Sequence, residues 1–272
     1  MEFIFELLKY KIATPKAYGL FHLIFIGLTI LLIILFSLKF KNPSEKFINK
    51  LFLIISVIML LLELYKQIVF TFSYESFEVI SDYQWYAFPF QFCSVPMYVY
   101  LLIPFTKGKI REALLAFSAS YSLFAGTAVM LYPGDVFIDI LGVSIQTMIH
   151  HGLMAVIGVY LLISKIVNVS FKTLLKATIV FSIVVIIALC LNYTFVKFIP
   201  EGETFNMFFI SPYFDCTLPV LSIIYPKVPY IGFLIIYILG FSIVAGIVNL
   251  IYFGIYKLVC EFNKDKNNYF YK

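Results

Sequence analysis

Two adjacent histidines, His150 and His151, lie inside an apolar segment, residues 140–163, that is long enough to cross a bilayer. Ionisable rings are costly in hydrocarbon, so an intramembrane histidine pair predicts a functional site. A histidine that burial keeps neutral can act as a general base near neutral pH. The alternative is a structural pair of rings that hydrogen-bond to neighbouring helices. Gln146 precedes His150 by one helical turn and therefore shares its helix face.

Glu63, Lys66 and Gln67 form a second polar group, inside the apolar segment 48–72. Their spacing of i, i+3 and i+4 places them on one helix face. Opposite charges stabilise each other in a low-dielectric interior, so one interpretation is a structural ion pair that fixes helix packing. The other is a binding site for a headgroup or a carboxylate, in which Lys66 holds the anion.

Cys93 lies between Pro89, which suits the start of a helix, and Pro96, which predicts a kink. A cysteine near a histidine can lose its proton and act as a nucleophile. Free cysteine is also a common small hydrophobe in protein cores. The sequence leaves open a disulfide among Cys93, Cys190 and Cys216.

Patterns for metals and cofactors are missing from the chain. It has three histidines without the HExxH spacing or an equivalent, so we predict no metal site. The last apolar segment, residues 228–256, has no lysine that could bind retinal, and no Walker or haem-attachment sequence occurs. We therefore expect no cofactor.

The composition is that of a membrane protein. Of 272 residues, 62% are hydrophobic and 13% are charged, against about 45–50% and about 25% in globular proteins. The mean hydropathy is +0.98. We predict an all-α polytopic membrane protein in which one domain, residues 1–272, is a bundle of seven transmembrane helices. The seven apolar segments are residues 18–38, 48–72, 87–105, 112–131, 140–163, 173–196 and 228–256.

Charges in the connections predict the orientation. Lysines and Arg111 gather after the first, third, fifth and seventh segments, whereas the connections after the second and fourth are acidic. By the positive-inside rule, the amino terminus lies outside and the carboxyl terminus inside. Because the lysines are spread over short loops, the net charge of +5 does not indicate a nucleic-acid partner.

Three segments are expected to lie outside the seven helices. Residues 1–16 contain a short amphipathic stretch that suits the membrane interface. Residues 197–227 contain four prolines and are expected to form an outer lid or re-entrant loop, since an eighth helix would place the carboxyl-terminal lysines outside. Residues 262–272 form a cytoplasmic tail.

Nearly all intramembrane polar residues lie in the outer half of this predicted bundle, with Asn249, near the inner end of its helix, as the exception. His150 lies roughly 15 Å below the outer end of its helix at 1.5 Å per residue. His22, Gln91 and Cys93 begin their helices at the outer side, and Asn192 ends its helix there. This distribution predicts one polar cavity that opens outward or to the outer leaflet.

Several runs of residues resemble a known family. They are Phe88-Pro-Phe-Gln-Phe-Cys-Ser94, Phe124-Ala-Gly126, Tyr132-Pro133 and Ile145-Gln-Thr-Met-Ile-His-His151, with Glu63, Lys66, Asn206 and Pro212. Together they resemble the YwaF-like family of bacterial integral membrane proteins. A eukaryotic branch of the wider family is described as a lipid acyltransferase that remodels ether phospholipids, with a catalytic cysteine and histidine. The resemblance implies Cys93 as the nucleophile and His150 or His151 as its base.

These observations lead to the hypothesis of a multi-pass plasma-membrane protein that acts as a lipid acyltransferase or acyl hydrolase on membrane lipids. The alternatives are a transporter or receptor for a small anionic or headgroup-like ligand, and a structural membrane protein. The oligomeric state stays open. Seven residues are candidates for binding the substrate or ligand: His22, Glu63, Lys66, Gln67, Gln91, Gln146 and Asn206.

Overall fold

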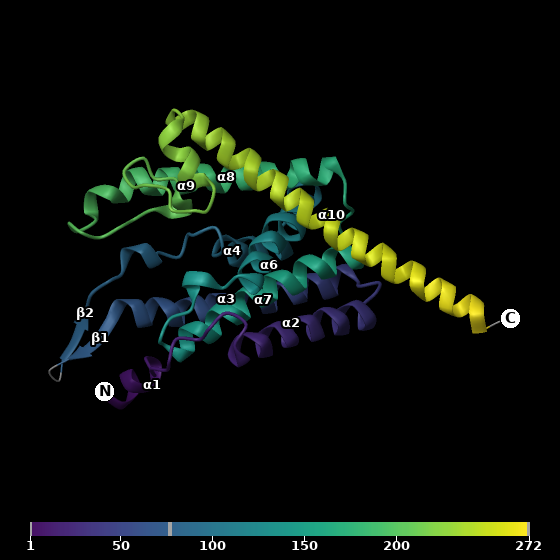
Figure 1. The fold of residues 1–272 in the computed structure, drawn as a ribbon, viewed down its shortest axis with the longest axis horizontal. Helices are drawn as coiled ribbons and strands as arrows, with labels where there is room; N and C mark the ends of the chain where they lie inside the picture. The colour runs from purple at the N-terminus through teal and green to yellow at the C-terminus, as the bar shows by residue number, and fades with distance from the viewer. Residues whose placement is uncertain (1, 76–77, 271–272) are drawn as a thin grey trace.

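The fold is a helical bundle with one small hairpin (Figure 1). The computed structural model describes residues 2–75 and 78–270. In chain order the α-helices are α1 (Glu2–Leu8), α2 (Leu20–Lys39), α3 (Glu45–Thr71), α4 (Val95–Leu102), α5 (Gly108–Phe117), α6 (Leu123–Leu131), α7 (Leu141–Ile163), α8 (Phe171–Phe195), α9 (Leu221–Ile224) and α10 (Tyr230–Phe270). Strands β1 (Phe72–Glu75) and β2 (Glu78–Ser81) pair antiparallel.

Six helical stretches in the described chain are long and apolar enough to cross a membrane. The remaining predicted segment, the third, is a shorter apolar helix, Val95–Phe105, made of α4 and a 3₁₀ turn. This confirms the all-α polytopic class. The six long stretches are Leu20–Lys39, Glu45–Thr71, Gly108–Leu131, Leu141–Ile163, Phe171–Phe198 and Tyr230–Leu258.

The third segment begins later than the sequence predicted. Helix α4 starts at Val95 and not near residue 87, and Pro96 lies in its first turn and not at a kink. Proline has no backbone N–H, so it fits the first turn of a helix, where that group needs no partner, but not the interior. The residues from Phe88 to Ser94 therefore form turns, which leave their backbone groups available to other elements.

Helix α7 is the centre of the bundle. In its most apolar stretch 83% of the residues are buried, against 6% in α2 and 17% in α10. Helices α2 and α3 lie on one side of the α6 and α7 pair, and α8 and α10 lie on the other (Figure 1). The polar residues of α7 therefore point into protein, whereas the exposed apolar side chains of the outer helices suit contact with lipid.

Close packing holds α6 against α7. A Cβ atom added at Gly126 would lie 2.7 Å from the backbone oxygen of His151, and one added at Gly158 would lie 2.5 Å from the Cβ of Leu123. These glycines let the two backbones approach as small residues do in membrane bundles. A π-helical segment, Ser118–Ser122, lies between α5 and α6 and is buried throughout. The position of the histidine pair is thus set by backbone contact with α6.

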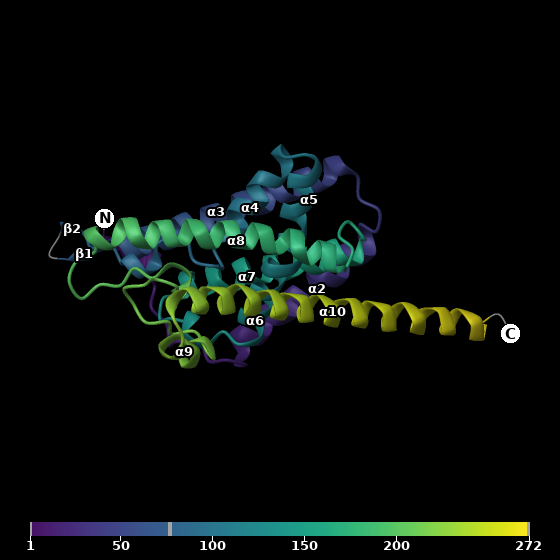
Figure 2. The ribbon, with the colours of Figure 1, turned by 90° about the horizontal axis from the view of Figure 1, so that it is seen from above.

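The segments outside the spanning helices gather mainly at one end of the bundle. Helix α1, the hairpin and most of the connection from α8 to α10 lie at this hairpin end, while α10 projects from the opposite end (Figure 2). On α1, Phe3, Ile4 and Leu7 are exposed, and the place of this segment at the membrane interface stays a prediction. Of the predicted tail, α10 continues to Phe270, and residues 271–272 lie outside the described residues.

Candidate functional site

The ring of His150 faces the turn that precedes α4. Its Nε2 atom lies 2.9 Å from the backbone oxygen of Cys93. A carbonyl oxygen only accepts hydrogen bonds, so Nε2 carries the hydrogen and the Nδ1 atom of the neutral ring holds a lone pair. That Nδ1 atom is buried and has no hydrogen-bond partner in the described part of the chain. His150 therefore has an unused proton acceptor on the same ring that bonds residue 93.

His151 shows the opposite tautomer. Its Nδ1 atom donates to the backbone oxygen of Thr147 at 2.7 Å, one helical turn earlier. The Nε2 atom is buried without a partner among the described residues. The ring centroids of His150 and His151 are 5.5 Å apart. A purely structural pair would bond through both nitrogens of each ring, and here one nitrogen of each ring is left over.

Cys93 is half-buried and carries a free thiol. Its contact with His150 is through the main chain, and within the described residues the thiol forms no hydrogen bond with either ring. Cys190 and Cys216 are also free, so the structure has no disulfide among these three cysteines. The Cys93 thiol and the free lone pair of His150 thus belong to two residues that are joined by one hydrogen bond, from the ring of His150 to the main chain of Cys93.

Glu63 and Lys66 form an ion pair on α3, which packs against α7. The ammonium of Lys66 lies 2.8 Å from Oε1 of Glu63, and the Glu63 side chain is 6% exposed. The charge of Lys66 reaches the Cys93 thiol and both histidine rings. The polar residues of α3 and α7 and the cysteine before α4 therefore belong to one cluster.

Gln67 connects this cluster to the segment after the hairpin. Its Nε2 atom donates to Oε1 of Glu63 at 2.8 Å and to the backbone oxygen of Ala87 at 2.7 Å. Its Oε1 atom accepts from the Tyr83 hydroxyl at 2.8 Å. Burial raises the pKa of Tyr83 to about 12, and the nearby Glu63 carboxylate adds to the increase. The hydroxyl of Tyr83 therefore stays protonated and continues to donate.

Gln91 and Asn206 bind backbone groups. Gln91 donates to the oxygen of Asn206 at 3.1 Å and accepts from the N–H of Phe208 at 2.9 Å. Asn206 donates to the oxygen of Asp215 at 3.1 Å and accepts from the N–H of Ser211 at 2.8 Å. Both amide groups are thus used to hold the connection between α8 and α10.

His22 lies apart from the histidine pair. Its Nδ1 atom accepts from the N–H of Tyr18 at 2.9 Å, and its Nε2 atom donates to the oxygen of Met130 at 3.0 Å. The ring is fully buried and both nitrogens have partners, so it ties the start of α2 to the end of α6. Gln146 is buried one turn before His150, and its oxygen accepts from the Thr147 hydroxyl at 3.4 Å.

Two further residues belong to the surroundings of the site. Asn192 and Tyr237 bond the backbone of the connection beside Gln91. Asn192 stands out in the sequence as an amide near the end of an apolar segment. Tyr237 carries no such signal, because tyrosine is common in this chain, with 20 copies.

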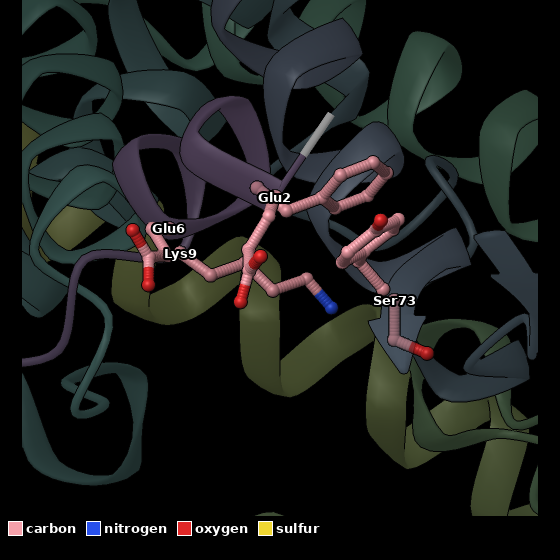
Figure 3. Close-up of a pocket in the computed structure, with 6 residues that line it drawn as sticks. Glu2, Glu6, Lys9 and Ser73 are labelled. Carbon is pink, nitrogen blue, oxygen red and sulfur yellow. The ribbon is translucent and has the colours of Figure 1, made fainter. Parts of the chain in front are cut away.

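A separate open hollow lies at the hairpin end, between α1 and β1 (Figure 3). Its volume is about 300 Å³, and Lys9 extends along it between the two elements. Burial lowers the pKa of the Lys9 ammonium, while the charge of Glu75 opposes this decrease. None of its lining residues belongs to the histidine cluster. They are Glu2, Phe5, Glu6, Lys9, Ser73 and Tyr74.

Fold and site together define a polytopic helical membrane protein with a buried polar cluster that contains a cysteine and two histidines. The sequence model of the TMEM164 family matches residues 17–253, so the chain belongs to the TMEM164 family, a multi-pass membrane family. A comparison with curated proteins and one with solved structures each found no match. The likeness to bacterial YwaF-like proteins stays a prediction.

Proposed function

We propose that this protein is a lipid acyltransferase or acyl hydrolase in which Cys93 is the nucleophile and His150 the base. The observation that supports this most is the hydrogen bond from His150 to the main chain of Cys93, with a free lone pair on the other ring nitrogen. The proposal requires the thiol and the lone pair to meet in the substrate complex, since catalytic hydrogen bonds often form only once substrate is bound.

The proposed reaction has two half-reactions. His150 takes the thiol proton while the sulfur attacks an ester carbonyl, the C–O bond of the donor lipid breaks, and the leaving alcohol takes the proton. The acyl group is then a thioester on Cys93. In the second half, His150 deprotonates the hydroxyl of an acceptor lipid, or water, which attacks the thioester. The C–S bond breaks and the thiolate regains a proton.

Lys66 is the residue proposed to hold the anionic part of the substrate. Its charge reaches the thiol and both rings, and its pairing with Glu63 keeps the ammonium in place. Such a charge stabilises a headgroup phosphate or the developing oxyanion. The positive-inside pattern supports an outward-facing hairpin end, so donor and acceptor would enter from the outer leaflet of the plasma membrane.

The test is acyl transfer by purified protein in lipid nanodiscs, with isotope-labelled phospholipid as donor and lysophospholipid as acceptor. We expect labelled product, or free fatty acid, with the wild type, and none with Cys93→Ser or His150→Ala. Cys190→Ser is the matched control, because that cysteine is exposed and remote in sequence from the cluster. Full transfer by Cys93→Ser would exclude the proposed nucleophile.

A second candidate function is binding or transport of a headgroup-like ligand. It is favoured by the Glu63–Lys66 pair, which offers both charges to a zwitterion, beside two unused histidine acceptors. In that case Cys93→Ala should leave ligand-induced thermal stabilisation unchanged, and no lipid of a test panel should be turned over by the wild type.

A further inference from the structure

Residues 205–211, which we name the plug, fold back from the α8–α10 connection into the bundle. Phe205, Met207, Phe208 and Ile210 are fully buried, although this stretch is neither an α-helix nor a strand. Irregular backbone at membrane depth requires partners within the protein for its polar groups. The side chains that supply those partners show how the plug is held in place.

Side chains of three other elements hold the backbone of the plug. Asn192 of α8 donates to the oxygen of Met207 at 3.0 Å and accepts from its N–H at 2.8 Å. Tyr237 of α10 donates to the oxygen of Phe208 at 3.0 Å. Gln91, in the turn before α4, bonds the plug through both ends of its amide. The plug is therefore fastened by a few side-chain hydrogen bonds and not by continuous secondary structure.

Two residues of the plug hold a backbone conformation that aromatic residues rarely adopt. Phe208 has φ of 60° and Phe209 has φ of 57°. Bulky residues with positive φ are strained, and such strain persists only where the surroundings enforce it. Here the hydrogen bonds from Asn192, Tyr237 and Gln91 belong to the surroundings that enforce this conformation.

The plug lies directly against the segment that carries Cys93. The ring of Phe208 is 5.9 Å from that of Phe92 and 6.0 Å from that of Phe90, measured between centroids. Gln91, which holds the plug, is two residues before Cys93. Movement of the plug therefore uncovers the rings of Phe90 and Phe92, which precede Cys93 in the chain.

We propose that the plug is a gate that covers the approach to Cys93 and leaves the bundle to admit the acyl chain of a lipid. The gate regulates access to the proposed catalytic site, and the identity of its substrate rests on that proposed function. The movement of the gate does not depend on catalysis. The hydrogen bonds from Asn192, Gln91 and Tyr237 oppose opening, and the strained backbone at Phe208 and Phe209 favours it.

The test measures how fast N-ethylmaleimide alkylates Cys93 in nanodiscs. Every variant carries Cys190→Ser, Cys216→Ala and Cys260→Ser, so that Cys93 is the single thiol. Tyr237→Phe removes one hydroxyl and one hydrogen bond to the plug, and should raise the alkylation rate about fivefold. Asn192→Ala removes two bonds and should raise it further.

Asn249→Ala is the matched control. Asn249 is also a buried amide in α10, but it bonds Ser120 of the π-helical segment and not the plug. We expect its alkylation rate to equal that of the parent protein. A Tyr237→Phe alkylation rate equal to the parent rate would overturn the gate. So would an equal acceleration by Asn249→Ala, because that result would show a general loosening of the bundle.

Alkylation also separates the two proposals. If acyl transfer is absent but Tyr237→Phe accelerates alkylation, the gate stands and the proposed chemistry fails. If transfer requires Cys93 but alkylation is insensitive to Tyr237 and Asn192, the chemistry stands and the gate fails.

Discussion

The ring of His150 and the backbone oxygen of Cys93 are joined by a hydrogen bond of 2.9 Å, although the two residues are 57 positions apart in the chain. This bond ties the central helix α7 to the turn before α4. It also decides which nitrogen of the ring keeps its lone pair, as outer partners of catalytic histidines commonly do. The two histidines are therefore not equivalent.

The first prediction concerns that difference. His150→Ala should lower kcat/KM for acyl transfer by about 100-fold or more, the usual effect of losing a general base. His151→Ala should lower it by less than about tenfold, because the ring of His151 bonds its own helix at Thr147. Initial rates in nanodiscs check this, and equal losses in the two variants would contradict the assignment.

The second prediction concerns the ion pair of α3. Glu63→Ala leaves the mostly buried ammonium of Lys66 without its carboxylate and should lower the free energy of unfolding by about 3 kcal/mol. The double variant Glu63→Leu with Lys66→Met should recover most of this loss, since no charge is then unpaired. Unfolding by sodium dodecyl sulfate in mixed micelles measures both. A double variant less stable than Glu63→Ala would show that the pair itself stabilises the bundle.

The third prediction concerns the contact between α6 and α7. Gly126→Ala places a Cβ atom 2.7 Å from the backbone oxygen of His151 and 2.8 Å from the nitrogen of Ala155. Because both neighbours are backbone atoms, the helices must separate, at a cost of about 1–3 kcal/mol in unfolding free energy. Gly240→Ala is the control, since no atom of the described residues lies within 4 Å of its added Cβ. Thermal unfolding of both variants should show a decrease for Gly126→Ala alone.

The fourth prediction concerns pH. The pKa of Tyr83 rises from 10.0 to about 12 on folding, mainly through burial. A raised pKa stabilises the folded state fully below the unfolded value, and this contribution is lost as the pH rises from about 10 to about 12. The stability difference between wild type and Tyr83→Phe should therefore shrink over that interval, and a constant difference would contradict it. Unfolding at a series of pH values measures the difference.

The polar residues illustrate how far sequence patterns reach. The i, i+3, i+4 spacing of Glu63, Lys66 and Gln67 predicts a shared helix face, and the structure shows Glu63 bonded to both Lys66 and Gln67. Membrane depth also predicts His22 and Gln91 as members of this group, because all of these residues lie in the outer half of the predicted bundle. Depth in the membrane says nothing about direction around the helix axis, and their side chains bond other segments.

The pattern of apolar residues is enough to predict a helical membrane protein and the course of its long helices. Apolar stretches of about twenty residues cross the bilayer as helices because backbone groups find no other partners in hydrocarbon. Only the tertiary structure decided that His150 bonds Cys93, that α4 starts at Val95, and that Gln91 fastens the plug. Those contacts depend on how helices distant in sequence rotate and pack, and no local pattern of residue types contains that information.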